Sequence, residues 1–198
     1  VGDGTTSVVP GTPEVAADGQ GGLLDVALAP DFSESGFVYL TYAKPGPGGA
    51  ATAVGRGRLA DGALVGFEDL WVQAPFHGTN RHFGSRIAFA PDGMLLVSTG
   101  DRGQKDPAQD LGDTVGVIVR LTPDGAVPDD NPFVGQAGAR PEIWSYGHRN
   151  AQSLAVDPAT GEIWEAEFGP RGGDELNRIE RGANYGWPLV SPGENYNR

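Results

Sequence analysis

Cysteine is absent from the 198-residue sequence, and 14 basic side chains stand against 26 acidic ones, for a formal net charge of −12. Without cysteine the protein has no disulfide and no thiolate metal site, and its redox compartment cannot be inferred from cysteine content. The acidic balance argues against binding to nucleic acid or to an anionic membrane. No apolar run approaches the length that spans a bilayer, so we expect no membrane insertion.

Two further kinds of segment are missing from the sequence. No stretch has the pattern of a long amphipathic helix. The sequence starts at Val1 inside patterned residues, without the charged and then apolar segments of a signal peptide. We therefore expect any targeting peptide to be absent or already removed.

Glycine and proline are abundant instead, with 32 and 16 residues, while hydrophobic residues make up 38% of the chain. This combination favours many short strands joined by tight turns over helices. A chain of 198 residues is long enough for a hydrophobic core and corresponds to one domain, or to a domain and a piece.

One pattern occurs three times: an apolar strand, a turn opened by proline, and a second apolar strand. Its copies lie at 23–40, 86–97 and 153–164. They follow one another at intervals of roughly sixty residues, a little above the spacing of four-stranded propeller blades. Further strands are expected at 53–59 and 116–121, between the copies.

The repeat predicts an all-β fold, a β-propeller of four-stranded antiparallel blades. We expect one partial propeller domain over 1–198, with about three blades centred on 20–60, 80–122 and 147–190. Three blades do not close a ring, since propellers use about four to eight. The chain thus looks like part of a larger unit: either it is a fragment of a six-bladed propeller, or its open blade edges are covered by another copy, as in a homo-oligomer, or by another chain.

The repeat also predicts which loops lie together. The proline turns should lie on one face, so the loops before each first strand and after each second strand should meet at the opposite face. The loops before the first strands hold Gln20, 80–82 and 149–152, and those after the second strands hold 44–46, 100–103 and 169–175. This convergence of polar residues at one end of a central channel is the main argument for a site.

Several of these residues suit particular chemistry. His82 is a candidate general base, because imidazole titrates near neutral pH, although a lone loop histidine is more often a surface residue. Arg149 and Asn150 offer donors at fixed angles to a planar anionic group. Asp101 could contact a substrate hydroxyl or cap a turn. His148 is expected to be structural, because it is next to Arg149 in sequence and adjacent residues on a strand point to opposite faces.

The segment 169–175 suits a hard cation, because it combines exposed backbone carbonyls with carboxylates, the oxygens that calcium prefers. The alternative is a glycine-rich turn that closes on a solvated acidic pair. The three histidines, by contrast, lack the spacing of a zinc site.

Five motifs in register resemble those of the soluble PQQ-dependent glucose and aldose sugar dehydrogenases. They lie at 19–24, 82–86, 100–103, 147–150 and 169–188. The resemblance covers nearly the whole chain. It implies a six-bladed propeller that binds pyrroloquinoline quinone (PQQ) and calcium at the end of its channel and works in the periplasm or outside the cell.

The resemblance also implies roles for single residues. His82 would take the proton from the anomeric hydroxyl of an aldose while a hydride passes to the quinone. Arg149 and Asn150 would hold the quinone edge, and Arg149 would stabilise the charge that develops on its oxygen. The backbone carbonyls of Gly169 and Pro170 would bind the calcium that polarises the quinone.

Further implied roles concern a second metal and the sugar. Glu175 and the carbonyl of Tyr185 would serve a second, structural calcium, while Gln20 and Asp101 would face the sugar. Arg81 departs from the family, which usually has an uncharged polar or acidic residue before the base. The later blades, which in the family supply basic residues to the cofactor, are not in this sequence.

The leading hypothesis is therefore an enzyme that oxidises aldoses with PQQ and calcium and passes electrons to a separate acceptor. One alternative is a non-catalytic, calcium-stabilised propeller that serves as a binding module, or an inactive fragment. The other is a calcium-dependent lactonase, against which the paired carbonyls of Gly169 and Pro170 argue, because such enzymes surround their metal with side chains.

Overall fold

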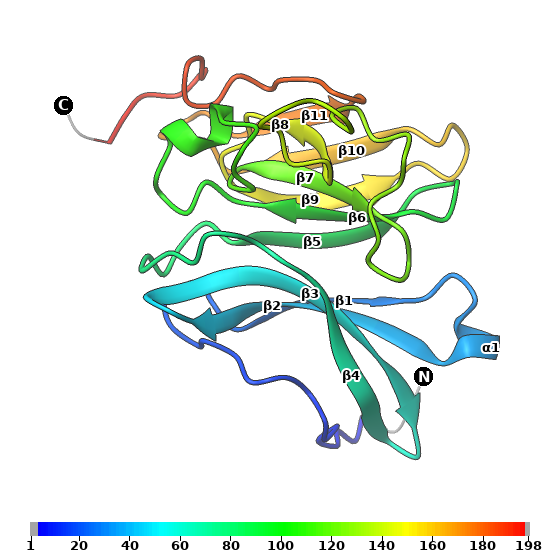
Figure 1. Cartoon of the computed structure of the whole chain (residues 1–198). Helices are drawn as coiled ribbons and strands as arrows, with labels where there is room; N and C mark the ends of the chain where they lie inside the picture. The colour runs from blue at the N-terminus through cyan, green and yellow to red at the C-terminus, as the bar shows by residue number, and fades with distance from the viewer. Residues whose placement is uncertain (1–3, 197–198) are drawn as a thin grey trace.

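The computed structural model describes residues 4–196 and consists of three antiparallel sheets (Figure 1). The first sheet holds, in order, β1 (Leu23–Leu28), β2 (Phe37–Gly46), β3 (Gly49–Ala60) and β4 (Ala63–Val72). The second holds β5 (Gly84–Phe89), β6 (Leu95–Thr99), β7 (Val117–Leu121) and β8 (Ile143–Tyr146). The third holds β9 (Ala151–Val156), β10 (Ile163–Glu167) and β11 (Glu175–Ile179).

The predicted all-β class is confirmed, and each of the three repeat copies forms a pair of adjacent antiparallel strands. The helical parts of residues 4–196 are the short turns α1 (Phe32–Ser35) and a 3-10 turn (Asp106–Gln109). Neither is long or apolar enough to cross a membrane. The first two sheets end at Val72 and Tyr146, beyond the ranges 20–60 and 80–122 on which the first two blades were expected to be centred.

One segment differs from expectation. Residues 44–46, expected in a loop near the site, belong to β2, which pairs with β3 up to Gly46 and Gly49. The reason is the Pro47-Gly48 step, in which Gly48 has a φ of 77° and closes a two-residue hairpin turn. The first sheet therefore contributes to the site through the segment before β1, which holds Gln20.

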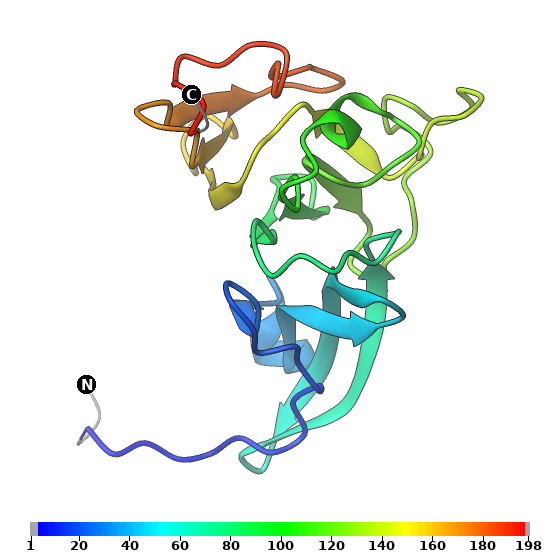
Figure 2. The same ribbon diagram turned by 90° about the vertical axis from the view of Figure 1, so that its left-hand side faces the viewer.

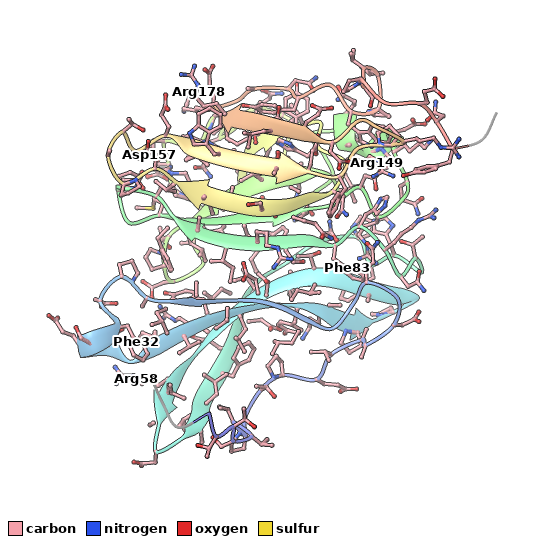
Figure 3. All side chains as sticks on the ribbon, turned by 180° about the vertical axis from the view of Figure 1, so that it is seen from behind. Phe32, Arg58, Phe83, Arg149, Asp157 and Arg178 are labelled. Atoms are coloured by element: carbon pink, nitrogen blue, oxygen red, sulfur yellow. The ribbon has the colours of Figure 1, made fainter. Side chains whose placement is uncertain are left out.

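The first strands of the three sheets are neighbours: β1 contacts β5, and β5 contacts β9. The sheets follow one another along an arc, as Figure 2 shows from the side. Phe83 and Arg149 lie at one end of the sheets, while Phe32 and Asp157 lie at the other, beside the proline turns (Figure 3). The expected separation of the two loop faces is therefore present.

The middle sheet is buried on both faces because its side chains alternate. Leu95 and Val97 of β6 point toward the first sheet and pack in one cluster with Tyr39. Leu96, between them in sequence, points the other way and packs with Ile179 of β11. The end sheets have no such cover on their outward sides, and these expose Leu23, Val26, Leu28 and Leu176 among the described residues.

This packing predicts a sharp contrast between two leucines. Leu96→Ala removes a fully buried side chain between two sheets and should lower the free energy of unfolding by about 2–5 kcal/mol. Leu176→Ala, the matched control on an outward face, is 70% exposed and should change it by less than about 0.5 kcal/mol. Urea unfolding of both variants checks this. A large loss in Leu176→Ala would show instead that another copy covers this face.

Candidate active site

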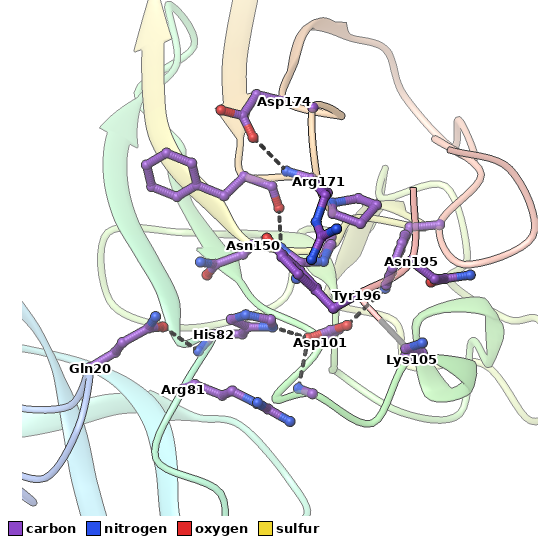
Figure 4. A pocket seen from close by; sticks show the side chains of 17 residues that line it. Gln20, Arg81, His82, Asp101, Lys105, Asn150, Arg171, Asp174, Asn195 and Tyr196 are labelled. Atoms are coloured by element: carbon purple, nitrogen blue, oxygen red, sulfur yellow. Dashed lines mark hydrogen bonds and ion pairs between the residues drawn. The ribbon is translucent and has the colours of Figure 1, made fainter. Parts of the chain in front are cut away.

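A cavity of about 990 Å³ opens at the end of the sheets where the polar loops meet (Figure 4). Of the residues that the sequence points to, seven line it: Gln20, His82, Asp101, Arg149, Asn150, Gly169 and Pro170. The cavity also includes Arg81, Gly103, Lys105, Phe168, Arg171, Gly172, Asp174, Trp187, Asn195 and Tyr196. Glu175 and Tyr185 do not line it and belong to a separate cluster.

His82 and Asp101 form the central pair of the cavity. The Nδ1 atom of His82 lies 2.6 Å from Oδ1 of Asp101, and Asp101 is 1% exposed. A buried carboxylate accepts hydrogen bonds, so Nδ1 carries the proton and Nε2 keeps its lone pair. This leaves His82 able to accept a proton at Nε2, as a general base must.

Both carboxylate oxygens of Asp101 accept hydrogen bonds. Besides His82, Oδ1 accepts a hydrogen bond from the backbone N–H of Gly103 at 2.7 Å. Oδ2 accepts one from the indole Nε1 of Trp187 at 2.8 Å. The backbone N–H of Asp101 donates to the carbonyl of Arg149 at 2.7 Å. Asp101 is therefore a partner of His82 and caps the turn to Gly103, the alternative role expected from the sequence, while its contact with a sugar stays a prediction.

The backbone of His82 is strained, with a φ of 54° in the left-handed region that non-glycine residues rarely adopt. Two contacts hold it there. Its N–H donates to Oε1 of Gln20 at 2.7 Å, which connects the first sheet to the second. Gly100 approaches the carbonyl of His82 so closely that a Cβ atom at residue 100 would clash with it. The surroundings thus dictate how the imidazole is presented to the cavity.

Beneath this loop lies Arg102, a fully buried guanidinium that sequence analysis did not identify. Its nitrogens donate to the carbonyls of Arg81, Ala50 and Thr79. Its Cζ atom lies 3.5 Å from the centre of the Phe83 ring, a close cation–π contact. Burial lowers the pKa of Arg102 to about 10, so it stays charged at neutral pH. The loop that carries His82 is fixed from below by one side chain.

Arg149 is only 9% exposed and lies on the other side of the cavity. One guanidinium nitrogen donates to the carbonyl of Phe168 at 2.6 Å, and its Cζ atom lies 5.3 Å from the Trp187 ring centre. Its Nε is buried without a hydrogen-bond partner among the described residues. Leaving a buried donor unpaired costs about 1–3 kcal/mol, so an acceptor that reached this guanidinium would relieve that cost.

Asn150 is buried. Its Oδ1 accepts a hydrogen bond from the backbone N–H of Gly84 at 3.2 Å, which leaves the amide nitrogen to the cavity. The turn at Gly169 and Pro170 is tight, and a Cβ at residue 169 would clash with the backbone of Gly173. The carbonyl of Pro170 accepts a hydrogen bond from Gly173 at 2.8 Å and has a second lone pair for a cation.

A second polar cluster lies away from the cavity, between the second and third sheets. His148, Glu165 and Glu167 are buried, and one ligand atom of each lies within 4.8 Å of the others. Glu175 sits opposite Glu167 across β10 and β11, and the Tyr185 ring stacks on His148 at 4.7 Å. The two expected ligands of a second calcium are therefore next to a buried pair of carboxylates that sequence analysis missed.

Burial controls the charge of this cluster. Burial lowers the pKa of His148 to about 3, so its imidazole is neutral, in keeping with the expected structural role. Burial also raises the pKa of Glu165 and Glu167, which repel each other. Two donors compensate in part: Arg149 donates its N–H to Glu167 at 2.6 Å, and Asn177 donates to Glu165 at 3.3 Å.

The alternating Glu165 and Glu167 in an otherwise apolar strand were the signal in the sequence that could have revealed this cluster. Acidic residues two positions apart on a buried strand share one face. Trp187 carried no comparable signal, because it lies 86 positions from Asp101 in sequence.

Comparison with known proteins shows the family of the chain. The family model described as "Glucose / Sorbosone dehydrogenase" matches residues 1–198. The chain is 48% identical to the aldose sugar dehydrogenase YliI of Escherichia coli, over 98% of the chain and 53% of that protein. A crystal structure of the soluble aldose sugar dehydrogenase from Escherichia coli, in the apo-form, aligns over 98% of the chain and 57% of its own length, with a TM-score of 0.96.

Two further relatives are named for a quinone cofactor. The PQQ-bound form of an aldose sugar dehydrogenase from Streptomyces coelicolor aligns with a TM-score of 0.81 and 35% identity, over 92% of the chain and 52% of that structure. Quinoprotein glucose dehydrogenase B of Acinetobacter calcoaceticus is 30% identical over 95% of the chain and 44% of that protein. The chain spans about half the length of the curated relatives that it matches.

Proposed function

The chain belongs to the glucose/sorbosone dehydrogenase family, and on that premise we propose that it carries the proton-transfer half of a PQQ- and calcium-dependent aldose dehydrogenase. The reaction is oxidation of the sugar at its anomeric carbon. The observation that carries the proposal is the His82–Asp101 pair, which shares one cavity with the partly unpaired guanidinium of Arg149. A binding module would have no need of a buried carboxylate that orients an imidazole.

His82, Asp101 and Gln20 each have a separate role in this reaction. Nε2 of His82 takes the proton of the anomeric hydroxyl, while Nδ1–H keeps its bond to Asp101. The Asp101 carboxylate stabilises the imidazolium that results, because an anion at 2.6 Å favours the charged ring. Gln20, whose Oε1 holds the His82 backbone, has its amide nitrogen left for a sugar hydroxyl. PQQ, when bound, supplies the quinone that accepts the hydride from the anomeric carbon.

The cavity fits an anionic, carbonyl-rich cofactor. Arg149 and Asn150 both line the cavity, and guanidinium and amide donors suit quinone oxygens. Arg149 would also stabilise negative charge that develops on such an oxygen. The carbonyls of Gly169 and Pro170 would hold calcium beside them, because they line the same cavity and calcium prefers oxygen ligands.

A second calcium would be structural and lie at Glu175 with the carbonyl of Tyr185. The support for it is geometric: Glu165, Glu167 and Glu175 share one face of the β10–β11 pair. Carboxylates gathered in a low dielectric are costly unless a cation compensates them. The same proposal includes an external electron acceptor, a periplasmic or secreted location, and cover for the outward faces, either by a second copy or by the rest of a six-bladed propeller.

The catalytic role is tested by reconstitution with PQQ and calcium, followed by dye reduction with glucose. We expect His82→Ala to lower the turnover number by about 10²-fold or more, because it removes the general base. His77→Ala is the matched control, since His77 does not line the cavity, and it should retain the activity of the unaltered chain. Equal turnover in both variants would contradict the proposal, and so would an unaltered chain that binds no PQQ.

The structural calcium is tested by thermal unfolding. A cation that binds only the folded chain stabilises it by about 2.7 kcal/mol at a hundredfold excess over Kd, which corresponds to a rise in Tm of about 5–10 °C for a chain of this size. Glu175→Gln should abolish most of this rise. Glu180→Gln alters an exposed glutamate on the surface and should not. A rise that is the same in both variants would place the calcium elsewhere.

A further inference from the structure

The cavity is cationic although the protein is acidic. Four basic residues line it, Arg81, Lys105, Arg149 and Arg171, against the two acidic residues Asp101 and Asp174, while the whole chain carries a net charge of −12. A concentration of positive charge against the overall charge of a protein indicates an anionic ligand. PQQ accounts for part of it, through Arg149. Arg81 and Lys105 need a separate explanation.

These two side chains lie near His82 and Asp101, on the side of the cavity away from Arg171 and Asp174 (Figure 4). Between described residues, no ion pair includes either of them. The oxygens of Asp101 contact His82, Gly103 and Trp187 rather than either of these cations. Two cations beside the base are therefore available to a ligand.

The loop that follows β6 holds Lys105 and lies against the side chain of Arg81. Gly103 has a φ of 69°, and a Cβ there would lie 2.7 Å from Nε of Arg81, so glycine allows the arginine to lie across the loop. Lys105 has a φ of 64°, a backbone conformation that residues other than glycine rarely adopt. Its Nζ lies 5.9 Å from the centre of the Trp187 ring, the same indole that donates to Asp101.

We propose that Arg81 and Lys105 form a subsite for an anionic group on the sugar, so that the preferred substrate is an acidic aldose. This inference rests on the proposed function and adds the substrate class. A sugar whose anomeric hydroxyl lies at His82 would place its carboxylate or phosphate against these two cations. A uronic acid and a sugar phosphate share this chemistry, and Arg81 suits either, because its planar fork matches both anions.

The test compares sugars that differ in charge at one position. D-Glucuronate and D-glucuronamide have nearly the same shape, and D-glucose 6-phosphate replaces the carboxylate by phosphate. With the PQQ- and calcium-loaded chain, we expect kcat/KM for glucuronate to exceed that for glucuronamide by about tenfold. The excess should shrink at high ionic strength. A larger kcat/KM for the phosphate than for glucuronate would identify sugar phosphates as the better class.

The double variant Arg81→Gln and Lys105→Met should bring the glucuronate-to-glucuronamide ratio close to one. Arg178→Gln is the control, because Arg178 lies at the other end of the sheets from Arg149 (Figure 3), and it should leave the ratio unchanged. A ratio of one in the unaltered chain would overturn the inference. A double variant that weakens PQQ binding in a spectral titration but keeps the ratio would also overturn it, because the two cations would then hold the cofactor.

Failure of the proposed function is distinguishable from failure of this inference. If no sugar is oxidised, the proposed function fails, and calorimetric titration of the loaded chain with glucuronate and with glucuronamide then tests the subsite alone. Tighter binding of glucuronate that disappears in the double variant supports the subsite. Equal binding of the two sugars, or binding of neither, overturns it.

Discussion

The buried carboxylate of Asp101 is the interaction on which the site depends. An anion at 1% exposure is tolerated only when its oxygens are fully hydrogen-bonded, and the donors come from separate parts of the chain. They are the imidazole of His82, the backbone of Gly103 and the indole of Trp187. The hydrogen bonds to this one carboxylate therefore hold three loops in fixed positions relative to one another. The strained backbone of His82 is held in place by these hydrogen bonds and by the one that its N–H donates to Gln20.

The propeller arrangement explains why such a network can form. Since β1, β5 and β9 are neighbours, the loops before each of them meet at one end of the sheets, and each contributes a different group. The first brings Gln20, the second His82 and the third Arg149. Stability and chemistry are thus separated in space, with alternating apolar side chains between the sheets and charged groups at their ends. The three sheets keep His82 and Asp101 together.

Much of this arrangement could be predicted from the sequence, because the repeat has a fixed period and the proline turns fix the direction of each strand pair. That was enough to bring Gln20, His82 and Arg149 to one cavity. What could not be predicted depends on side chains that meet from distant positions. The role of Asp101 required Trp187, and the role of Arg102 required three carbonyls from separate segments. Residues 44–46 were misplaced because the Pro47-Gly48 turn extends the hairpin of the first sheet.

The central claim is that Asp101 fixes the proton of His82 on Nδ1. Nitrogen-15 NMR of the histidine-labelled chain tests it most directly, because the two ring nitrogens of a neutral imidazole differ in shift according to which carries the proton. We expect a protonated Nδ1 and an unprotonated Nε2 for His82, with this preference lost in Asp101→Asn. A neutral His82 that carries its proton on Nε2 in the unaltered chain would contradict it, because that nitrogen could not then accept the proton of a sugar hydroxyl.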